Sequence, residues 1–145
     1  MSRALADEAL IRKLIEDRAK AVRAKDIDGA TSHIAPDILS FDVVNPLQSI
    51  GSDALRKRAR EWFFSFEGPV GYELRDLSIT VGDDVAFSHS LNRIGGTTKD
   101  AGKLDLWLRW TAGYRKTNGK WLIVHEQVSV PVDMRNGKAM LQLKP

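Results

Sequence analysis

The chain has 145 residues, the length of one ordinary domain, and no break in composition suggests a second domain. Its 22 basic and 19 acidic residues are spread along the sequence, so the net charge of +3 gives no support for a nucleic-acid-binding role. There is no cysteine, which excludes disulfides, a thiol nucleophile and zinc sites built from thiolates.

Three helices are predicted in the first half of the chain. Apolar residues recur at helical spacing from about Ala6 to Ala24. A short second helix is predicted in the segment DIDGATSHIA and ends before Pro36, and a third spans Ser52 to Phe66 with Ser52 as its N-cap. The charged first segment, MSRALADEALIRKL, has no uninterrupted apolar run. We therefore expect no signal peptide, no membrane-spanning segment and a cytoplasmic protein.

Strands follow the second helix. The segment ILSFDVV predicts one strand between the second and third helices. After Pro69 the apolar pattern changes to period two in four segments, with turn signals at Gly82-Asp83, Gly95 to Gly102 and Asn118-Gly119. Helices first and an antiparallel run of strands last predict an α+β fold, with helices covering one face of a curved sheet. The four segments are YELRDLSITV, DVAFSHSLNRI, KLDLWLRWTAGYRK and WLIVHEQVSV.

The order α-α-β-α-β-β-β-β resembles the nuclear transport factor 2-like fold, and within it the SnoaL-like and ketosteroid isomerase-related proteins. The segment AVRAKDIDGATSHIAPDILSFDVVNPLQSIGSDALRKRAREWF is similar to this group's helix, turn, strand and next helix, and GKWLIVHEQVSVP is similar to its last strand. The resemblance covers nearly the whole chain, and residues 1–145 are expected to form one domain of this kind. It implies a single domain with a cone-shaped cavity between bent sheet and helices, and a homodimer. It does not specify the reaction, because this scaffold carries isomerases, cyclases, dehydratases, hydrolases and non-catalytic binding modules.

Asp42 is the first candidate catalytic residue. Alternation places it on one face of its strand with Ser40 and Val44, near Trp62 if the third helix covers that face. A partly desolvated carboxylate at this position is suited to moving protons. Overlaid through AKDIDG and IAPDILSFD, the general-base aspartate of the ketosteroid isomerases falls on Asp42. The alternative is a carboxylate that caps a turn or pairs with an arginine.

The same overlay argues against a true steroid isomerase. The oxyanion-binding tyrosine of those enzymes falls on Arg18, and their protonated aspartic acid falls near Ala112. Neither of their hydrogen-bond donors to the enolate is kept, so the largest electrostatic contribution to that reaction would be lost.

The last two strands each show one polar and one apolar face. Because side chains alternate along a strand, matching polar faces on neighbouring strands predict one shared site, in the cavity that Asp42 also reaches. The polar residues are His125, Gln127 and Ser129 on the last strand, on the face that begins with Trp121 and Ile123, and Asp105, Trp107, Arg109 and Thr111 on the strand before it.

His125 is the second candidate catalytic residue, because an imidazole titrates near neutral pH. The alternative is a half-buried histidine bonded to Asp105 or to a backbone carbonyl. SnoaL-like relatives often end in HEHVSVP, so His125 and Ser129 match, while Gln127 replaces a second histidine and cannot take up a proton. His89 is compatible with either the pocket or the core.

Trp62 and Phe66, one helical turn apart, are candidates for an apolar pocket wall. No H-x-H, H-x-x-x-H or paired-carboxylate spacing appears, so the sequence predicts no metal site and no cofactor.

The sequence therefore predicts a small-molecule pocket protein, and we expect an enzyme. In this hypothesis Asp42 and His125 move protons, and Arg109 with Gln127 holds an oxygen-bearing group of a modest, largely apolar ligand. The alternative is a non-catalytic ligand-binding or dimerisation module of the same fold. A homodimer is expected through an apolar outer face of the sheet. That face is predicted to contain Leu106, Leu108, Trp110, Leu122, Val124, Val128 and Val130.

Overall fold

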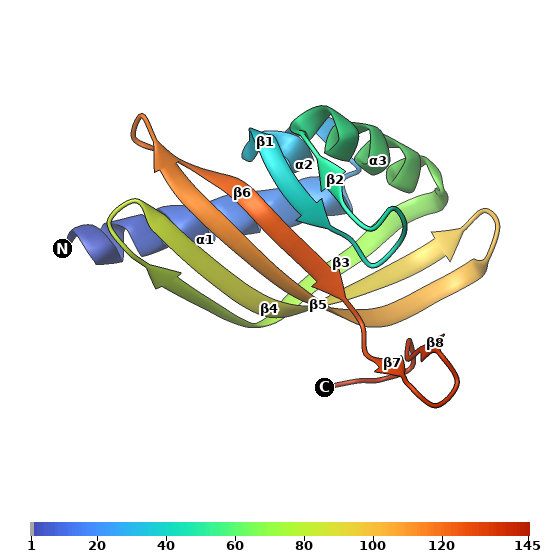
Figure 1. Ribbon diagram of the computed structural model, residues 1–145. Coiled ribbons are helices and arrows are strands. Elements are labelled where there is room, and N and C mark those ends of the chain that lie inside the picture. The colour runs from blue at the N-terminus through green and yellow to red at the C-terminus, as the bar shows by residue number, and fades with distance from the viewer. Residues whose placement is uncertain (1) are drawn as a thin grey trace.

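Three helices lie against one strongly bent sheet in the computed structural model, which describes residues 2–145 (Figure 1). The six main strands are ordered β2-β1-β6-β5-β4-β3 and pair antiparallel, except that β1 and β6 are parallel. This confirms the predicted α+β fold. The elements are α1 (Arg3–Arg23), α2 (Ile27–Thr31), β1 (Ile34–Phe41), β2 (Ser49–Ile50), α3 (Ser52–Phe64), β3 (Phe66–Val81), β4 (Val85–Thr98), β5 (Gly102–Thr117), β6 (Lys120–Ser129), β7 (Val132–Asp133) and β8 (Lys138–Ala139).

The helices cover one face of the sheet, called the inner face below. In α1 the side chains of Ile11, Leu14 and Ile15 are buried, and they pack against sheet residues such as Trp110 and Ile123. No helix in residues 2–145 is long and apolar enough to cross a membrane. The short β7–β8 hairpin forms a separate sheet that projects from the main one (Figure 1).

The start of α3 differs from the prediction. Ser52 is the first helical residue, and Gly51 is the N-cap, with no side-chain hydrogen bond to the helix. The backbone angle φ of Gly51 is 95°, a conformation that side chains with a Cβ adopt only with strain. The prediction of Ser52 as N-cap was wrong because a glycine was needed one residue earlier.

A β-bulge in β6 decides which of its side chains face inward. Gly113 of β5 pairs with His125, but the next residue, Tyr114, pairs with Ile123, so Val124 is an extra residue. An extra residue reverses the alternation of every side chain that follows it. Ile123 therefore faces inward as predicted, but Glu126 takes the inner position that the sequence assigned to His125.

The polar residues of β5 and β6 share one face as predicted, but the prediction that this face points into the cavity was wrong. On β5 the inner face is apolar, since burying indole and leucine side chains is favourable and burying unpaired charges is costly. The outer face of the sheet carries Asp105, Trp107, Arg109 and Thr111 from β5, and His125, Gln127 and Ser129 from β6.

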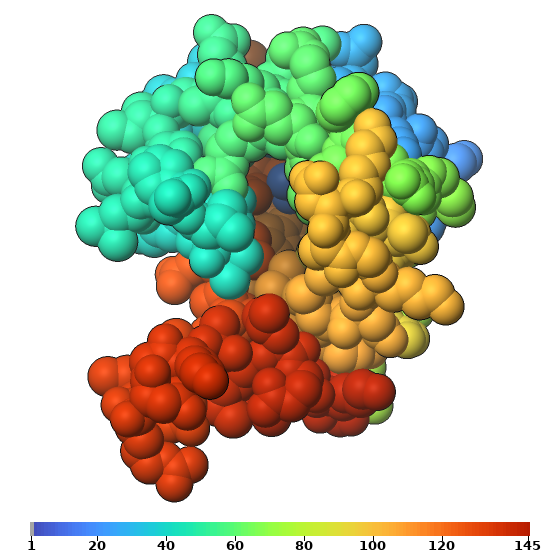
Figure 2. Space-filling model, turned by 90° about the vertical axis from the view of Figure 1, so that its right-hand side faces the viewer, coloured from blue at the N-terminus to red at the C-terminus, as the bar shows by residue number. Residues whose placement is uncertain are grey.

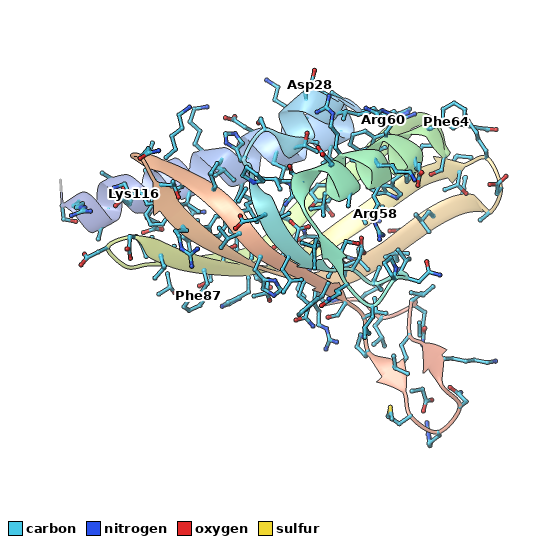
Figure 3. The ribbon with its side chains drawn as sticks, turned by 45° about the horizontal axis from the view of Figure 1, so that its top comes forward. Asp28, Arg58, Arg60, Phe64, Phe87 and Lys116 are labelled. Carbon is cyan, nitrogen blue, oxygen red and sulfur yellow. The ribbon has the colours of Figure 1, made fainter. Side chains whose placement is uncertain are left out.

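The apolar outer face consequently has other members than predicted. Leu106, Leu108, Trp110, Val128 and Val130 belong to the interior, whereas Leu122 and Val124 remain on the outer side. On β4 the exposed Val85 and Phe87 lie on that side together with Leu91, which is a diagonal neighbour of Trp107 on β5. Figure 3 shows Phe87 on the side of the sheet away from the helices.

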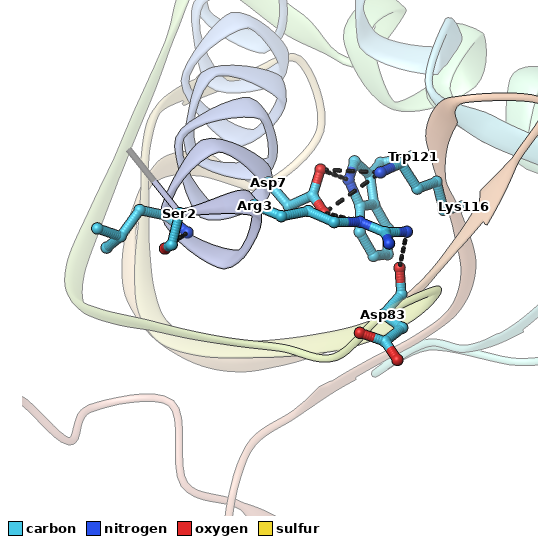
Figure 4. Close-up of polar contacts among 7 residues, drawn as sticks. Ser2, Arg3, Asp7, Asp83, Lys116 and Trp121 are labelled. Atoms are coloured by element: carbon cyan, nitrogen blue, oxygen red, sulfur yellow. Dashed lines mark hydrogen bonds and ion pairs between the residues drawn. The ribbon is translucent and has the colours of Figure 1, made fainter.

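A buried carboxylate ties the first turns of α1 to the sheet (Figure 4). Asp7 is 4% exposed and accepts hydrogen bonds from Lys116 Nζ at 3.1 and 3.2 Å and from Trp121 Nε1 at 3.2 Å. Arg3 Nε lies 3.9 Å from the same carboxylate. The hydrogen bond from Lys116 holds the pKa of Asp7 below its ordinary value of 3.8.

We expect the substitution Asp7→Asn to lower the melting temperature at neutral pH, because Lys116 loses its counter-charge. The folded-state pKa of Asp7 is lowered, so its stabilisation is complete above about pH 4 and is lost as the pH falls through the folded pKa. The gap in melting temperature between wild type and variant should therefore narrow in acid, as followed by circular dichroism. Asp17→Asn, at a half-exposed pair with Lys13, is the control with a smaller effect; a pH-independent gap would contradict this role for Asp7.

The homodimer through the outer sheet face stays a prediction, now resting on Phe87 and its neighbours. Light scattering at micromolar concentration should give the mass of two chains. Phe87→Lys should shift the protein towards the monomer, because it places a charge in the expected contact. Leu5→Lys changes a similarly exposed apolar residue on α1 and should have no effect. A monomeric wild type would contradict the prediction.

Candidate functional site

A cavity of about 270 Å³ opens between α3 and the inner face of the sheet. Figure 2 looks into the hollow, with the β1–β2 segment and α3 above it and to the left, the β4–β5 turn to the right and the C-terminal segment below. This volume lies just under the range of about 300–1,000 Å³ that is usual for ligand pockets, which favours a small ligand. Its apolar lining includes Val22, Leu55, Ala59, Trp62, Phe63, Ile94, Leu108, Trp110 and Val128.

A buried ion pair forms part of the cavity wall. Arg18 of α1 places Nη2 at 3.1 Å from Oε2 and 3.3 Å from Oε1 of Glu126 on β6. The Arg18 guanidinium also lies 5.6 Å from the ring centre of Trp110, within the range of a cation–π contact. Burial lowers the pKa of Arg18, but the charge of Glu126, the smaller contributions of Tyr72 and Tyr114 and the hydrogen bond to Glu126 together outweigh it and raise that pKa. Arg18 therefore stays cationic.

One oxygen of Glu126 is buried without a hydrogen bond. The Arg18 N–H is directed at Oε1, so Oε2 touches the same guanidinium but accepts no hydrogen bond from any residue in 2–145. A buried acceptor without a hydrogen bond costs about 1–3 kcal/mol, and here the ion-pair contact with Arg18 offsets part of that cost. Such an atom in a cavity wall is a natural acceptor for a proton or a donor group of a ligand.

A short chain of polar side chains lies beside this pair on β3 and β4. Ser90 Oγ donates to Asn92 Oδ1 at 2.6 Å, and Asn92 Nδ2 donates to the hydroxyl of Tyr72 at 2.7 Å. Tyr72 and Asn92 both line the cavity. Burial raises the pKa of Tyr72 above its ordinary value of 10.0, so the hydroxyl is neutral at physiological pH.

Asp42 lies at the cavity as the sequence predicts, but an arginine binds it. Arg58 of α3 donates from Nη2 to Asp42 Oδ2 at 2.8 Å and from Nη1 to the carbonyl of Asn45 at 3.2 Å. The other oxygen, Oδ1, accepts from the backbone N–H of Val43 at 2.6 Å. Both oxygens are occupied, which corresponds to the ion-pair alternative rather than to a free base.

Of the two aromatic residues predicted to form a pocket wall, one lines the cavity and one does not. Trp62 lines the cavity. Phe66 is buried behind it, with ring centres 5.2 Å apart at right angles, and does not line the cavity.

The predicted site on the last two strands does not line the cavity. His125 uses Nδ1 to hydrogen-bond the carbonyl of Leu39 at 2.7 Å and packs edge-on against Phe41, which is the structural alternative noted from the sequence. Asp105 is paired with Arg93 on the outer face at 2.8 Å. These assignments fail because the bulge and the apolar inner face of β5 turn the polar side chains outward. The residues concerned are Asp105, Trp107, Arg109, His125, Gln127 and Ser129. His89 of β4, for which the sequence left pocket and core open, is exposed on the outer face and belongs to neither.

The sequence predicted no cavity role for Arg18, Tyr72, Asn92 or Glu126, which all line the cavity. A signal for Arg18 existed, because the overlay on the ketosteroid isomerases places it at an oxyanion-binding position. No comparable signal marks Glu126, since its inward direction depends on the bulge.

Comparison with known proteins agrees with this architecture. Residues 11–133 match the model of the SnoaL-like domain. The chain belongs to the SnoaL-like family. The resemblance expected from the sequence is thus confirmed. No protein with a curated description matches this SnoaL-like chain.

Solved structures share the fold. A nuclear transport factor 2-like protein of unknown function from Pseudomonas putida KT2440 is 36% identical, with a TM-score of 0.90 over 99% of this chain and 100% of that one. A proposed dehydratase from Streptomyces avermitilis is 13% identical, with a TM-score of 0.78 over 90% and 99%. A ketosteroid isomerase-like protein from Erwinia carotovora atroseptica is 20% identical, with a TM-score of 0.70 over 83% and 93%. The last two similarities show the fold alone.

The buried pair should respond differently to single and double substitution. Arg18→Met leaves Glu126 buried without its cation and should cost about 3–5 kcal/mol of unfolding free energy. Adding Glu126→Leu removes the stranded charge, so the double variant should be more stable than Arg18→Met. Urea unfolding measures both. Arg93→Met breaks an exposed pair and should cost much less. Equal stability of single and double variants would show that the two charges do not depend on each other.

Proposed function

We propose that the protein is an enzyme that moves a proton on a small, neutral, largely apolar carbonyl compound bound in the cavity. The observation that supports this most directly is Glu126 Oε2, a buried carboxylate oxygen with no hydrogen-bond donor among residues 2–145, beside the cationic Arg18. A base and a stabilising positive charge thus lie together in an otherwise largely apolar chamber.

In the proposed step Glu126 Oε2 takes a proton from the carbon next to the carbonyl group. The electron pair of the broken C–H bond forms a carbon–carbon double bond, and the carbonyl oxygen becomes an enolate oxygen. Arg18 stabilises that negative charge through its N–H groups. Return of the proton to another carbon of a conjugated enolate gives an isomer. Expulsion of a hydroxyl group, which leaves as water with the proton of Glu126, gives a dehydrated product.

The charges of the cavity favour a neutral ligand. Its lining contains two cations, Arg18 and Arg58, and two anions, Asp42 and Glu126, and each cation is paired with an anion. A charged ligand would add an unpaired charge to a partly desolvated space, at a high cost in free energy. A ketone or aldehyde adds none.

The proposal changes the roles expected from the sequence. Arg58 and the Val43 N–H occupy both oxygens of Asp42, so we assign this residue to the cavity wall and not to proton transfer. His125 has no part in the step, because it lies on the outer face. Glu126 takes over the role of base.

A non-catalytic ligand-binding module is the second candidate. It is favoured by the pairing of Arg18 with Glu126, which could serve stability alone. In that case ketones would bind in the cavity, but no proton would leave them faster than in buffer.

Hydrogen–deuterium exchange separates the two functions without knowledge of the natural substrate. Acetophenone, 1-tetralone and cyclohexanone all carry hydrogens next to a carbonyl, and NMR in D2O measures the loss of those hydrogens. We expect the wild-type protein to accelerate the exchange of at least one ketone. Glu126→Gln should reduce that acceleration about 10²–10⁴-fold, because an amide cannot accept the proton.

Asp105→Asn is the matched control, since it changes a carboxylate on the outer face and should leave the exchange as in wild type. Circular dichroism checks that each variant is folded. Binding of ketones without accelerated exchange would reject the catalytic proposal in favour of the binding module. Equal exchange by wild type and Glu126→Gln would reject Glu126 as the base.

A further inference from the structure

The geometry points to Tyr72 as a fixed hydrogen-bond donor that makes the cavity selective for ligands presenting an acceptor oxygen. The inference names the substrate class of the proposed function and rests on it for the reaction, but the selectivity itself concerns binding. It follows from the direction of the hydrogen bonds that reach Tyr72 from β4.

The chain of hydrogen bonds starts at a buried serine. Ser90 is 5% exposed, and its hydroxyl donates to Asn92 Oδ1 at 2.6 Å. Asn92 is 3% exposed, and with its carbonyl oxygen occupied in this way its amide nitrogen is turned towards Tyr72, to which it donates at 2.7 Å. The hydrogen bonds therefore all run in one direction, from Ser90 through Asn92 to Tyr72.

This direction determines what Tyr72 offers to the cavity. The phenol oxygen accepts the Asn92 N–H, so its own hydrogen must be used elsewhere. Within residues 2–145 it donates to no acceptor, and the Tyr72 side chain lines the cavity. The hydroxyl hydrogen is thus available to a ligand.

Strand pairing holds the donor in place. Tyr72 pairs with Ile94 across β3 and β4, while Asn92 pairs with Leu74, so Tyr72 and Asn92 are diagonal neighbours on the inner face. A donor built on paired strands keeps a fixed position, which is what hydrogen-bond selectivity requires.

The donors of the cavity define the ligand class. Tyr72 offers an O–H, and Arg18 has N–H groups beyond the one nitrogen that bonds Glu126. Both groups seek an acceptor, which a carbonyl oxygen supplies. A neutral hydrocarbon of the same shape would leave both donors unpaired, so these donors should favour a ketone over the corresponding hydrocarbon.

The test uses acetophenone labelled with ¹³C at the carbonyl, whose infrared stretching frequency falls as the oxygen accepts hydrogen bonds. In the wild-type protein we expect a lower frequency than in Tyr72→Phe, and binding about tenfold weaker in that variant. Asn92→Asp should change the carbonyl frequency and the affinity in the same way. A carboxylate at this position accepts the Tyr72 hydrogen, so that hydrogen is no longer available to the ligand.

Tyr114→Phe is the matched control. Tyr114 is a second buried tyrosine, bonded to Ser88 at 2.8 Å, and it does not line the cavity, so its hydroxyl should not affect the carbonyl frequency. The hydrocarbon ethylbenzene has the carbon skeleton of acetophenone and is also neutral, but it has no acceptor oxygen. The ratio of ketone affinity to hydrocarbon affinity should fall from wild type to Tyr72→Phe.

The outcomes are distinguishable from those of the exchange experiment. A frequency and an affinity that are the same in wild type, Tyr72→Phe and Asn92→Asp would overturn the inference even where Glu126-dependent exchange is found. The same ratio of ketone affinity to hydrocarbon affinity in wild type and Tyr72→Phe would also overturn it. A frequency that depends on Tyr72, without any exchange, would support the donor and reject the catalytic proposal. If acetophenone fails to raise the melting temperature of the wild type, the inference is overturned.

Discussion

The extra residue Val124 in β6 is the constraint on which the cavity depends. By reversing the alternation after Ile123, it brings a carboxylate to the inner face instead of an imidazole. The residues that pair with Glu126 on either side are Ala112 of β5 and Ser40 of β1, both small and buried. Small neighbours leave room for the Arg18 side chain to reach Glu126 from α1. The buried ion pair therefore depends on three features together: the bulge, the small neighbours of Glu126 and the arginine on α1.

This arrangement places a strongly polar group in a domain of modest size. A buried ion pair is seldom more stabilising than apolar side chains of the same volume, so its presence calls for a reason beyond stability. The reason proposed above is chemical, since Arg18 and Glu126 together supply a positive charge and an acceptor in a largely apolar chamber. Sites of this kind are where proteins depart from locally favourable sequence patterns.

Local sequence patterns predicted much of the fold but only part of the site. Helical spacing, turn residues and period-two segments located the helices and main strands, and alternation from Ser40 brought Asp42 to the cavity. The pattern of WLIVHEQVSV is compatible with a regular strand, and only pairing with β5 across the Gly113 position reveals the bulge. Each face of the segment DLWLRWT carries a tryptophan, so hydrophobicity alone does not determine which face of this strand points towards the helices. Residues placed by long-range pairing were therefore missed.

The contact between Arg18 and Glu126 also bears on how the chain folds. These residues are 108 positions apart, and β1 meets β6 across a similarly long separation. Because contacts so distant in sequence form after local ones, α1 carries its arginine without a counter-charge until the last long strand has been added. A nascent chain on the ribosome would hold an incomplete chamber with apolar walls open to solvent. We therefore expect the protein to be most exposed to aggregation before β6 is added.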